Sequence, residues 1–246
     1  MFADYSWSEL GSIFAMQGFA GLVLFSVLVL MALGLAIIFG QMGVINMAHG
    51  EFMILGAYVT YLVAGFFEAF LPALVPISFF VAVVLAFFAS GALGVAVEMS
   101  LIRFLYKRPL DTLLATWGLS LILQQTYRTI FGAREVGVTL PSWMMGSLPL
   151  TDIIEIPING LIVMAITLLI TLGVYLVMFR SRLGAQTRAV VQNRTMAGAV
   201  GIDTEKVDRM TFGLGCGIAG VAGSAFTMIG STGPSAGQLY IVDTFL

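Results

Sequence analysis

The sequence predicts an all-α fold, a polytopic transmembrane helical bundle, on three observations. Of the 246 residues, 59% are apolar and only 10% are charged, whereas an ordinary soluble chain is about a quarter charged, and the mean hydropathy is +1.03. Apolar stretches long enough to cross a bilayer recur along the chain. Polar, glycine-rich segments interrupt two of these stretches. We therefore expect a bundle of about six spans with two broken membrane segments.

The six expected spans are separated by short polar or proline-containing segments. Residues 131–158 hold several charges and prolines, so we expect a loop of short turns there and no span. The residues before the first apolar run include no Lys or Arg, so the first helix is expected to be retained and not cleaved as a signal. The expected spans are 11–31, 51–67, 77–97, 111–130, 159–179 and 211–229.

Basic residues predict the orientation of the bundle. The loops 98–109 and 180–209 hold all but two of the 11 basic residues, Arg128 and Arg134 being the others. By the positive-inside rule these two loops are cytoplasmic, which places the N-terminus outside. A net charge of −2 gives no electrostatic reason to expect a nucleic-acid partner.

The first broken segment is Gly40–Glu51. No charged residue lies between Leu10 and Gly50, and as one helix that stretch would reach about 61 Å, twice the ~30 Å hydrocarbon core. Asn46, His49 and Glu51 lie where the chain must break, and ionisable groups at membrane depth are candidates for a solute path. The alternative is a helix end at the interface, with Glu51 in the first turn of the next helix and His49 as a structural group.

The second broken segment is Gly230–Gly237. Paired interruptions in the two halves of a membrane protein indicate a transport site, in which Ser231 and Thr232 would offer hydroxyls to a small polar solute. An ordinary extracellular turn is the alternative. In the fourth span, Gln124 and Gln125 point about 100° apart, so one is expected to line a polar interior or to bond a neighbouring helix.

The stretch 184–203 predicts a short amphipathic cytoplasmic helix between two spans. Arg188 and Arg194 fall on its polar side, Gly198 and Gly201 suit its C-terminal end, and Asp203 caps the next helix. Such a helix could rest on lipid headgroups. We favour docking to a cytoplasmic partner.

Three segments resemble one family of membrane proteins. The segments 43–51 and 55–58, together with the loop 182–203, are similar to the branched-chain amino acid type of ABC importer permease. The details at 108–118, 124–125, 230–234 and 240–243 look closer to the urea-transporting branch of that family.

The resemblance implies a single permease domain over 1–246, with the coupling loop 180–209 inside it, in a bacterial inner membrane. It implies a second related permease subunit, two cytoplasmic ATPase subunits and an extracytoplasmic solute-binding protein, besides membrane lipid. The segment from Arg188 to Gly201 matches the part that contacts an ATPase. Family members continue beyond Leu246, so further C-terminal helices are expected.

The expected function is import of a small polar solute, most simply urea or a short amide. A branched-chain or other amino acid permease is the alternative, followed by a passive channel or an ion-coupled carrier. No phosphate-binding loop of the G-x-x-x-x-G-K-[ST] type occurs, so ATP and Mg would be bound by partner subunits and this chain needs no cofactor. With one His and no G-x-S-x-G or zinc-type spacing, no catalytic or metal residue is assigned.

Overall fold

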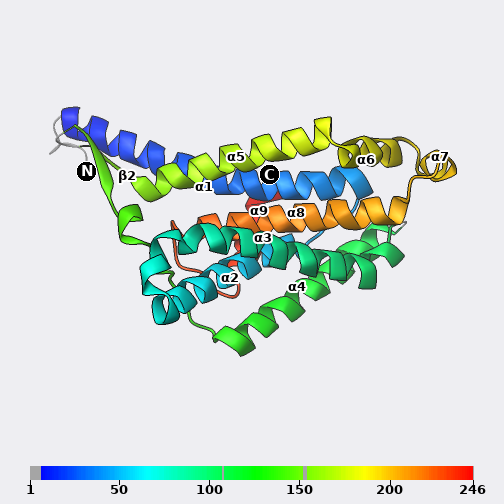
Figure 1. Ribbon diagram of the computed structural model, residues 1–246, viewed down its shortest axis with the longest axis horizontal. Helices are drawn as coiled ribbons and strands as arrows, with labels where there is room; N and C mark the ends of the chain where they lie inside the picture. Colours follow the sequence, from blue (N-terminus) through cyan, green and yellow to red (C-terminus); the bar gives the residue numbers. More distant parts are fainter. Residues whose placement is uncertain (1–6, 107, 152–153, 246) are drawn as a thin grey trace.

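The computed structural model describes residues 7–106, 108–151 and 154–245 as an elongated bundle of helices (Figure 1). Leu246, together with Lys107 of the expected loop 98–109 and Asp152 of the expected loop 131–158, lies outside these ranges. The helices are α1 (Trp7–Met42), α2 (His49–Phe70), α3 (Val75–Ser100), α4 (Pro109–Phe131), α5 (Ile158–Arg180), α6 (Arg182–Gln192), α7 (Arg194–Ala199), α8 (Thr204–Phe226) and α9 (Ala236–Phe245).

The all-α prediction is confirmed, and each of the six expected spans corresponds to one long helix. These helices are α1, α2, α3, α4, α5 and α8, of 22 to 36 residues. Among the described residues, four segments are both long and apolar enough to cross a membrane: Leu10–Met42, His49–Phe70, Pro72–Phe104 and Ile158–Arg180. The helices α4 and α8 have the length but carry more polar residues and glycine.

The first helix is longer than the sequence predicted. We expected its span to end near Met31, but α1 continues to Met42 because no helix-breaking conformation occurs before Gly43, which has a φ of +64°. The first interruption is therefore only Gly43–Ala48, and α2 begins at His49. This places Glu51 in the first turn of a helix, as the interfacial alternative predicted.

Helix α8 is the centre of the bundle, and α1, α2 and α3 pack around it (Figure 1). The packing is close because glycines of α8 meet backbone of its neighbours. A Cβ added at Gly223 would lie 1.9 Å from the carbonyl oxygen of Met53 in α2, and one added at Gly56 would lie 2.0 Å from that of Gly220. Small residues allow such approach in lipid, where van der Waals contact drives helix association.

The loop 131–158 contains a β-hairpin that the sequence did not predict. Strand β1 (Ser147–Thr151) pairs antiparallel with β2 (Ile154–Pro157). Two of the prolines that suggested only turns, Pro149 and Pro157, lie in the strands, where a short two-stranded ribbon tolerates their missing donors. A 3₁₀ turn, Ser142–Met144, precedes the hairpin, and the Trp143 indole donates to the Pro76 carbonyl at 3.0 Å, which fastens the loop to the start of α3.

The second interruption separates α8 from α9. Thr232 and Val136 exchange two backbone hydrogen bonds of 2.9 Å and so form an isolated bridge. Gly237, expected inside the interruption, lies in the first turn of α9. The predicted break is confirmed, and it is shorter at its C-terminal end than expected.

Candidate functional site

The first interruption is held by its own side chains and by α4. The Asn46 side chain is fully buried, and its Oδ1 accepts a hydrogen bond of 3.1 Å from the amide of Ala48, which closes a local turn. The amide of Met47 donates to Thr116 Oγ1 at 3.1 Å. The linker is thus an ordered segment, and one of its anchors comes from the fourth expected span.

Glu51 is the centre of a buried hydrogen-bond cluster. Only 1% of this residue is exposed, and its Oε1 accepts from Ser120 Oγ at 3.0 Å and from Gln124 Nε2 at 2.8 Å. Gln124 also donates to Ser120 Oγ at 3.1 Å, and the Tyr127 hydroxyl donates to the Glu51 carbonyl at 3.0 Å. These bonds offset much of the cost of burying a carboxyl group.

The partners of Glu51 belong to a line of buried side chains on α4, which we call the polar stripe. Its members recur at intervals of four and then three residues, so they share one face of the helix. All of them can hydrogen-bond, and together they are every residue that α4 buries: Thr112, Thr116, Ser120, Gln124 and Tyr127.

The other predicted path residues lie elsewhere. His49 is buried and faces α1, where its Nε2 lies 3.3 Å from the Met31 carbonyl beside Gly34. Gln125 is exposed on the side of α4 away from Gln124, so only one glutamine reaches the cluster. Ser231, between α8 and α9, donates to Glu135 in the loop that follows α4.

The two interruptions meet in space. A Cβ added at Gly50 would lie 2.2 Å from the carbonyl oxygen of Gly237, so the first turns of α2 and α9 touch through backbone. Next to this contact, Tyr58 stacks on Phe131 with ring centroids 4.0 Å apart, and Ala236 packs on the same cluster. The sequence paired these two interruptions as counterparts in the two halves of the chain, and the structure adds that they are in contact.

The predicted cytoplasmic helix is two helices, because Asn193 stops α6 and starts α7. The Asn193 side chain caps α7 by accepting from the Met196 amide at 2.9 Å. The predicted ends are confirmed: Gly201 has a φ of +89°, and Asp203 caps α8 by accepting from the Lys206 amide at 3.0 Å. Gly198 lies within α7 and not at its end.

Arg194 does not lie on the free polar side that the sequence predicted. It forms an ion pair with Asp208 of α8, whose side chain is only 1% exposed, and its guanidinium lies over the Tyr106 ring. Asp208 also accepts from Gln41 Nε2, at the end of α1, at 3.3 Å. The helical wheel failed here because Arg194 begins a new helix. Arg188 remains at the surface, where it donates to the Met178 carbonyl.

Tyr106 completes this polar junction. Its hydroxyl donates to Glu98 of α3. Burial, and then the neighbouring Glu98, raise the pKa of Tyr106 above its usual range, so the hydroxyl stays protonated and keeps donating. A cleft of about 670 Å³ opens beside the junction, lined by several basic and polar side chains, Gln41, Arg103, Tyr106, Arg108 and Arg194 among them.

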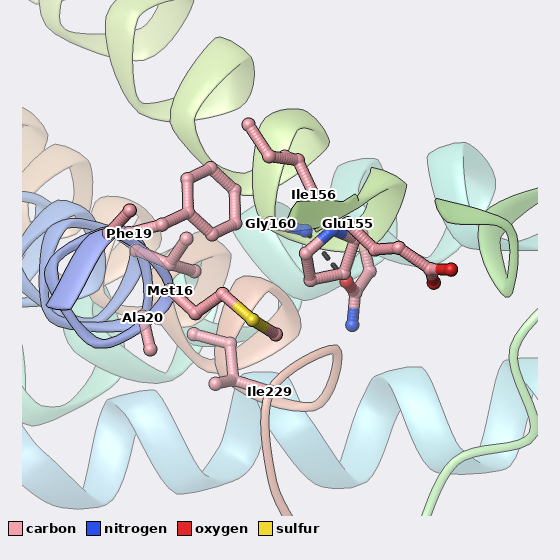
Figure 2. Close-up of a pocket in the computed structure, with 11 residues that line it drawn as sticks. Met16, Phe19, Ala20, Glu155, Ile156, Gly160 and Ile229 are labelled. Carbon is pink, nitrogen blue, oxygen red and sulfur yellow. Dashed lines mark hydrogen bonds between the residues drawn. The ribbon is translucent and has the colours of Figure 1, made fainter. Parts of the chain in front are cut away.

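A separate cavity of about 300 Å³ lies between α1, β2 and the start of α5 (Figure 2). Apolar side chains such as Met16, Phe19 and Ile229 line it, and the Glu155 carboxylate points away from them. The dashed bond in Figure 2 is local, from the amide of Gly160 to Asn159 Oδ1 at 2.8 Å. None of the predicted path residues lines this cavity. Within the described part of the chain, no group of three His, Cys, Asp or Glu side chains could hold a metal ion.

Comparison with known proteins supplies the family context. Residues 18–246 match the family model described as "Branched-chain amino acid transport system / permease component". The high-affinity branched-chain amino acid transport system permease protein LivH of Salmonella typhimurium is 31% identical over 224 residues, which are 85% of this chain and 69% of the relative. BraD of Pseudomonas aeruginosa, named likewise, is 27% identical over 92% of this chain and 75% of its own.

A more distant relative comes from an archaeon. The probable branched-chain amino acid transport permease protein LivH of Methanocaldococcus jannaschii is 26% identical over 96% of this chain and 73% of the relative. No solved structure matches. The similarity to the urea-transporting branch that the sequence suggested has no support among these relatives, whose names all specify branched-chain amino acids.

Proposed function

Because this chain belongs to the family of branched-chain amino acid transport permeases, we propose that it is the permease subunit of an ATP-driven importer of the ABC type that moves branched-chain amino acids across a bacterial inner membrane. The observation that carries the proposal is the family match over 18–246 on a polytopic helical bundle. The urea or short-amide reading gives way to this alternative, since the relatives named above are all branched-chain amino acid permeases.

The proposed solute path passes the first interruption. Glu51 and Gln124 are hydrogen-bonded there, Ser120 and Tyr127 bond Glu51 as well, and Asn46 lies in the linker that leads to Glu51. A buried carboxyl and amide group could bond the ammonium group of an amino acid, which is a donor, and they suit a short amide equally well.

Four predicted path residues lie outside the Glu51 cluster in this proposal. Ser231 and Thr232 belong to the outer end of the path, near Glu135 and Val136. His49 holds α2 to α1, and Gln125 faces outward.

The proposed partners are a second permease subunit, two cytoplasmic ATPase subunits and an extracytoplasmic solute-binding protein. In this scheme the α6–α7 region docks on an ATPase through its surface, which includes Arg188. Gly198, Gly201 and Asp203 set the shape of the segment that follows α6. ATP and Mg would be bound by the ATPase subunits.

Reconstitution of the full complex in proteoliposomes tests the proposal. We expect ATP-dependent uptake of labelled leucine that excess isoleucine or valine suppresses and excess urea does not. Uptake of urea without uptake of leucine would favour the urea-transporting branch instead. Leucine uptake that persists without ATPase subunits and ATP would refute an ATP-driven importer and indicate a channel or carrier.

A further inference from the structure

Helix α4 differs from the other long helices in what it buries. Its whole buried face is the polar stripe, whereas α8 buries mainly glycine, alanine and larger apolar residues. The opposite face of α4 is apolar and exposed, with Leu110, Leu114, Ile122 and Ile130 on it. In Figure 1, α4 runs at an angle to the bundle and stands apart from it along much of its length.

The contacts of the polar stripe converge on one segment. Thr116 bonds the linker at Met47, and the hydroxyl and amide groups further along the stripe bond Glu51. Hydrogen bonds are therefore a main part of the contact between α4 and residues 45–51. An interface of this kind can exchange its bonds with water, which an apolar interface cannot do.

Several buried polar atoms in and beside this interface have unused hydrogen-bonding capacity. Among the described residues, Glu51 Oε2, Asn46 Nδ2 and the Tyr58 hydroxyl have no hydrogen-bond partner. The Tyr58 ring packs against Tyr127 of the polar stripe. Buried polar atoms in folded proteins are nearly always bonded, to protein or to water, so these groups are able to accept or donate further hydrogen bonds.

We propose that the interface between the polar stripe and residues 45–51 is the solute path in its closed form. During transport α4 moves away from the first turn of α2, and Ser120, Gln124, Asn46 and Glu51 then face water and the solute. Glu51 is a positioning residue in the closed form and a solute contact in the open form. This inference rests on the proposed function, because it assigns the path of the same importer.

A reversible cross-link across the interface tests the proposal. In a Cys216→Ala background, Met47→Cys with Thr116→Cys puts one thiol on each side of the interface, at two residues that a hydrogen bond of 3.1 Å from the Met47 backbone amide to Thr116 Oγ1 now joins. In the reconstituted complex we expect oxidation to abolish ATP-dependent leucine uptake and reduction to restore it, with ATPase association unchanged. Full uptake by the oxidised pair would overturn the proposal.

A matched cross-link controls for disulfide formation itself. Thr60→Cys with Ser224→Cys joins α2 to α8 where the two hydroxyls now lie 2.8 Å apart, inside the close-packed core. We expect this pair, when oxidised, to keep its uptake. Equal loss of uptake from both pairs would refute a specific movement of α4. Absence of leucine uptake in the reduced parent would instead contradict the proposed function.

Labelling gives an independent readout if the first pair does not cross-link. Ser120→Cys should react with a membrane-impermeant thiol reagent during ATP turnover and much less at rest, with protection by excess leucine. Ser90→Cys is the control, because Ser90 is equally buried but bonds the Phe52 carbonyl between α2 and α3. If Ser120→Cys stays as unreactive as Ser90→Cys during turnover, α4 does not open.

Discussion

Replacing Arg194 by Gln should lower the free energy of unfolding by about 2 kcal/mol. The change removes the only cation that the described residues place in an ion pair with Asp208, whose side chain is 1% exposed. Gln41 still donates to this carboxylate, at 3.3 Å. The buried charge therefore keeps one neutral donor and loses its counter-charge.

The magnitude follows from the exposure of the two partners. Breaking a fully buried ion pair costs about 3–5 kcal/mol, and a hydrogen bond to a charged group is worth about 1.5–3 kcal/mol. The Arg194 side chain is 45% exposed, so water can approach the carboxylate once the guanidinium is gone. The expected loss of unfolding free energy is therefore that of a hydrogen bond to a charged group, about 2 kcal/mol, and not that of a fully buried ion pair.

A double-mutant cycle isolates the interaction. Unfolding of the purified chain in mixed micelles, with rising SDS and tryptophan fluorescence as the signal, gives the free energy for the parent, Arg194→Gln, Asp208→Asn and the double variant. We expect a coupling energy of about 1–2 kcal/mol. Arg188→Gln is the control, and it should change the free energy by less than about 0.5 kcal/mol because its partner is a surface carbonyl. A coupling energy near zero would refute the inference that Arg194 is fastened to α8.

Three further outcomes are expected. Gly223→Ala should destabilise the bundle by about 1–3 kcal/mol or more, since its methyl group would strike the backbone of α2. Gly118→Ala, which has open space around it, should be neutral or stabilising. Equal stability of the two variants in the micelle assay would contradict the close packing of α8 against α2. Gly201→Ala should lower the free energy of unfolding by about 1 kcal/mol, because φ is +89° there. Gly198→Ala, within α7, should be tolerated. A larger loss of stability from Gly198→Ala than from Gly201→Ala would contradict the need for glycine at 201. Arg188→Glu should reduce co-purification of the ATPase subunits and leave membrane insertion intact; unchanged co-purification would remove Arg188 from the docking surface.

The spans could be predicted where the sequence marks their ends. The third and fifth expected spans differ from α3 and α5 by only a few residues, because prolines and charges bound those apolar runs. The end of the first span was predicted eleven residues too early, since α1 ends at Met42 and not at Met31. Gly34 and Gly40 lie inside the helix, and only Gly43 adopts a left-handed conformation, a distinction that composition does not carry.

The candidate site could be predicted only in part. Glu51 and Gln124 were noticeable as polar residues in an apolar surround, and the structure joins them. Which of two adjacent glutamines faces the interior depends on how α4 is rotated, which packing decides. The remaining partners had one usable signal, the four-residue spacing of Thr112, Thr116, Ser120 and Gln124, since it places four small or polar side chains on one helical face.

The same contacts connect the loop region to the first interruption. Asp208 bonds both Arg194 of α7 and Gln41 of α1, and Gln41 is two residues before Gly43, where α1 ends. A displacement of α7 therefore changes the restraint on the end of α1, from which the linker leads directly to Glu51 and the polar stripe. The close glycine contacts of α8 make that helix a fixed support, so the segments free to respond are the linker and α4.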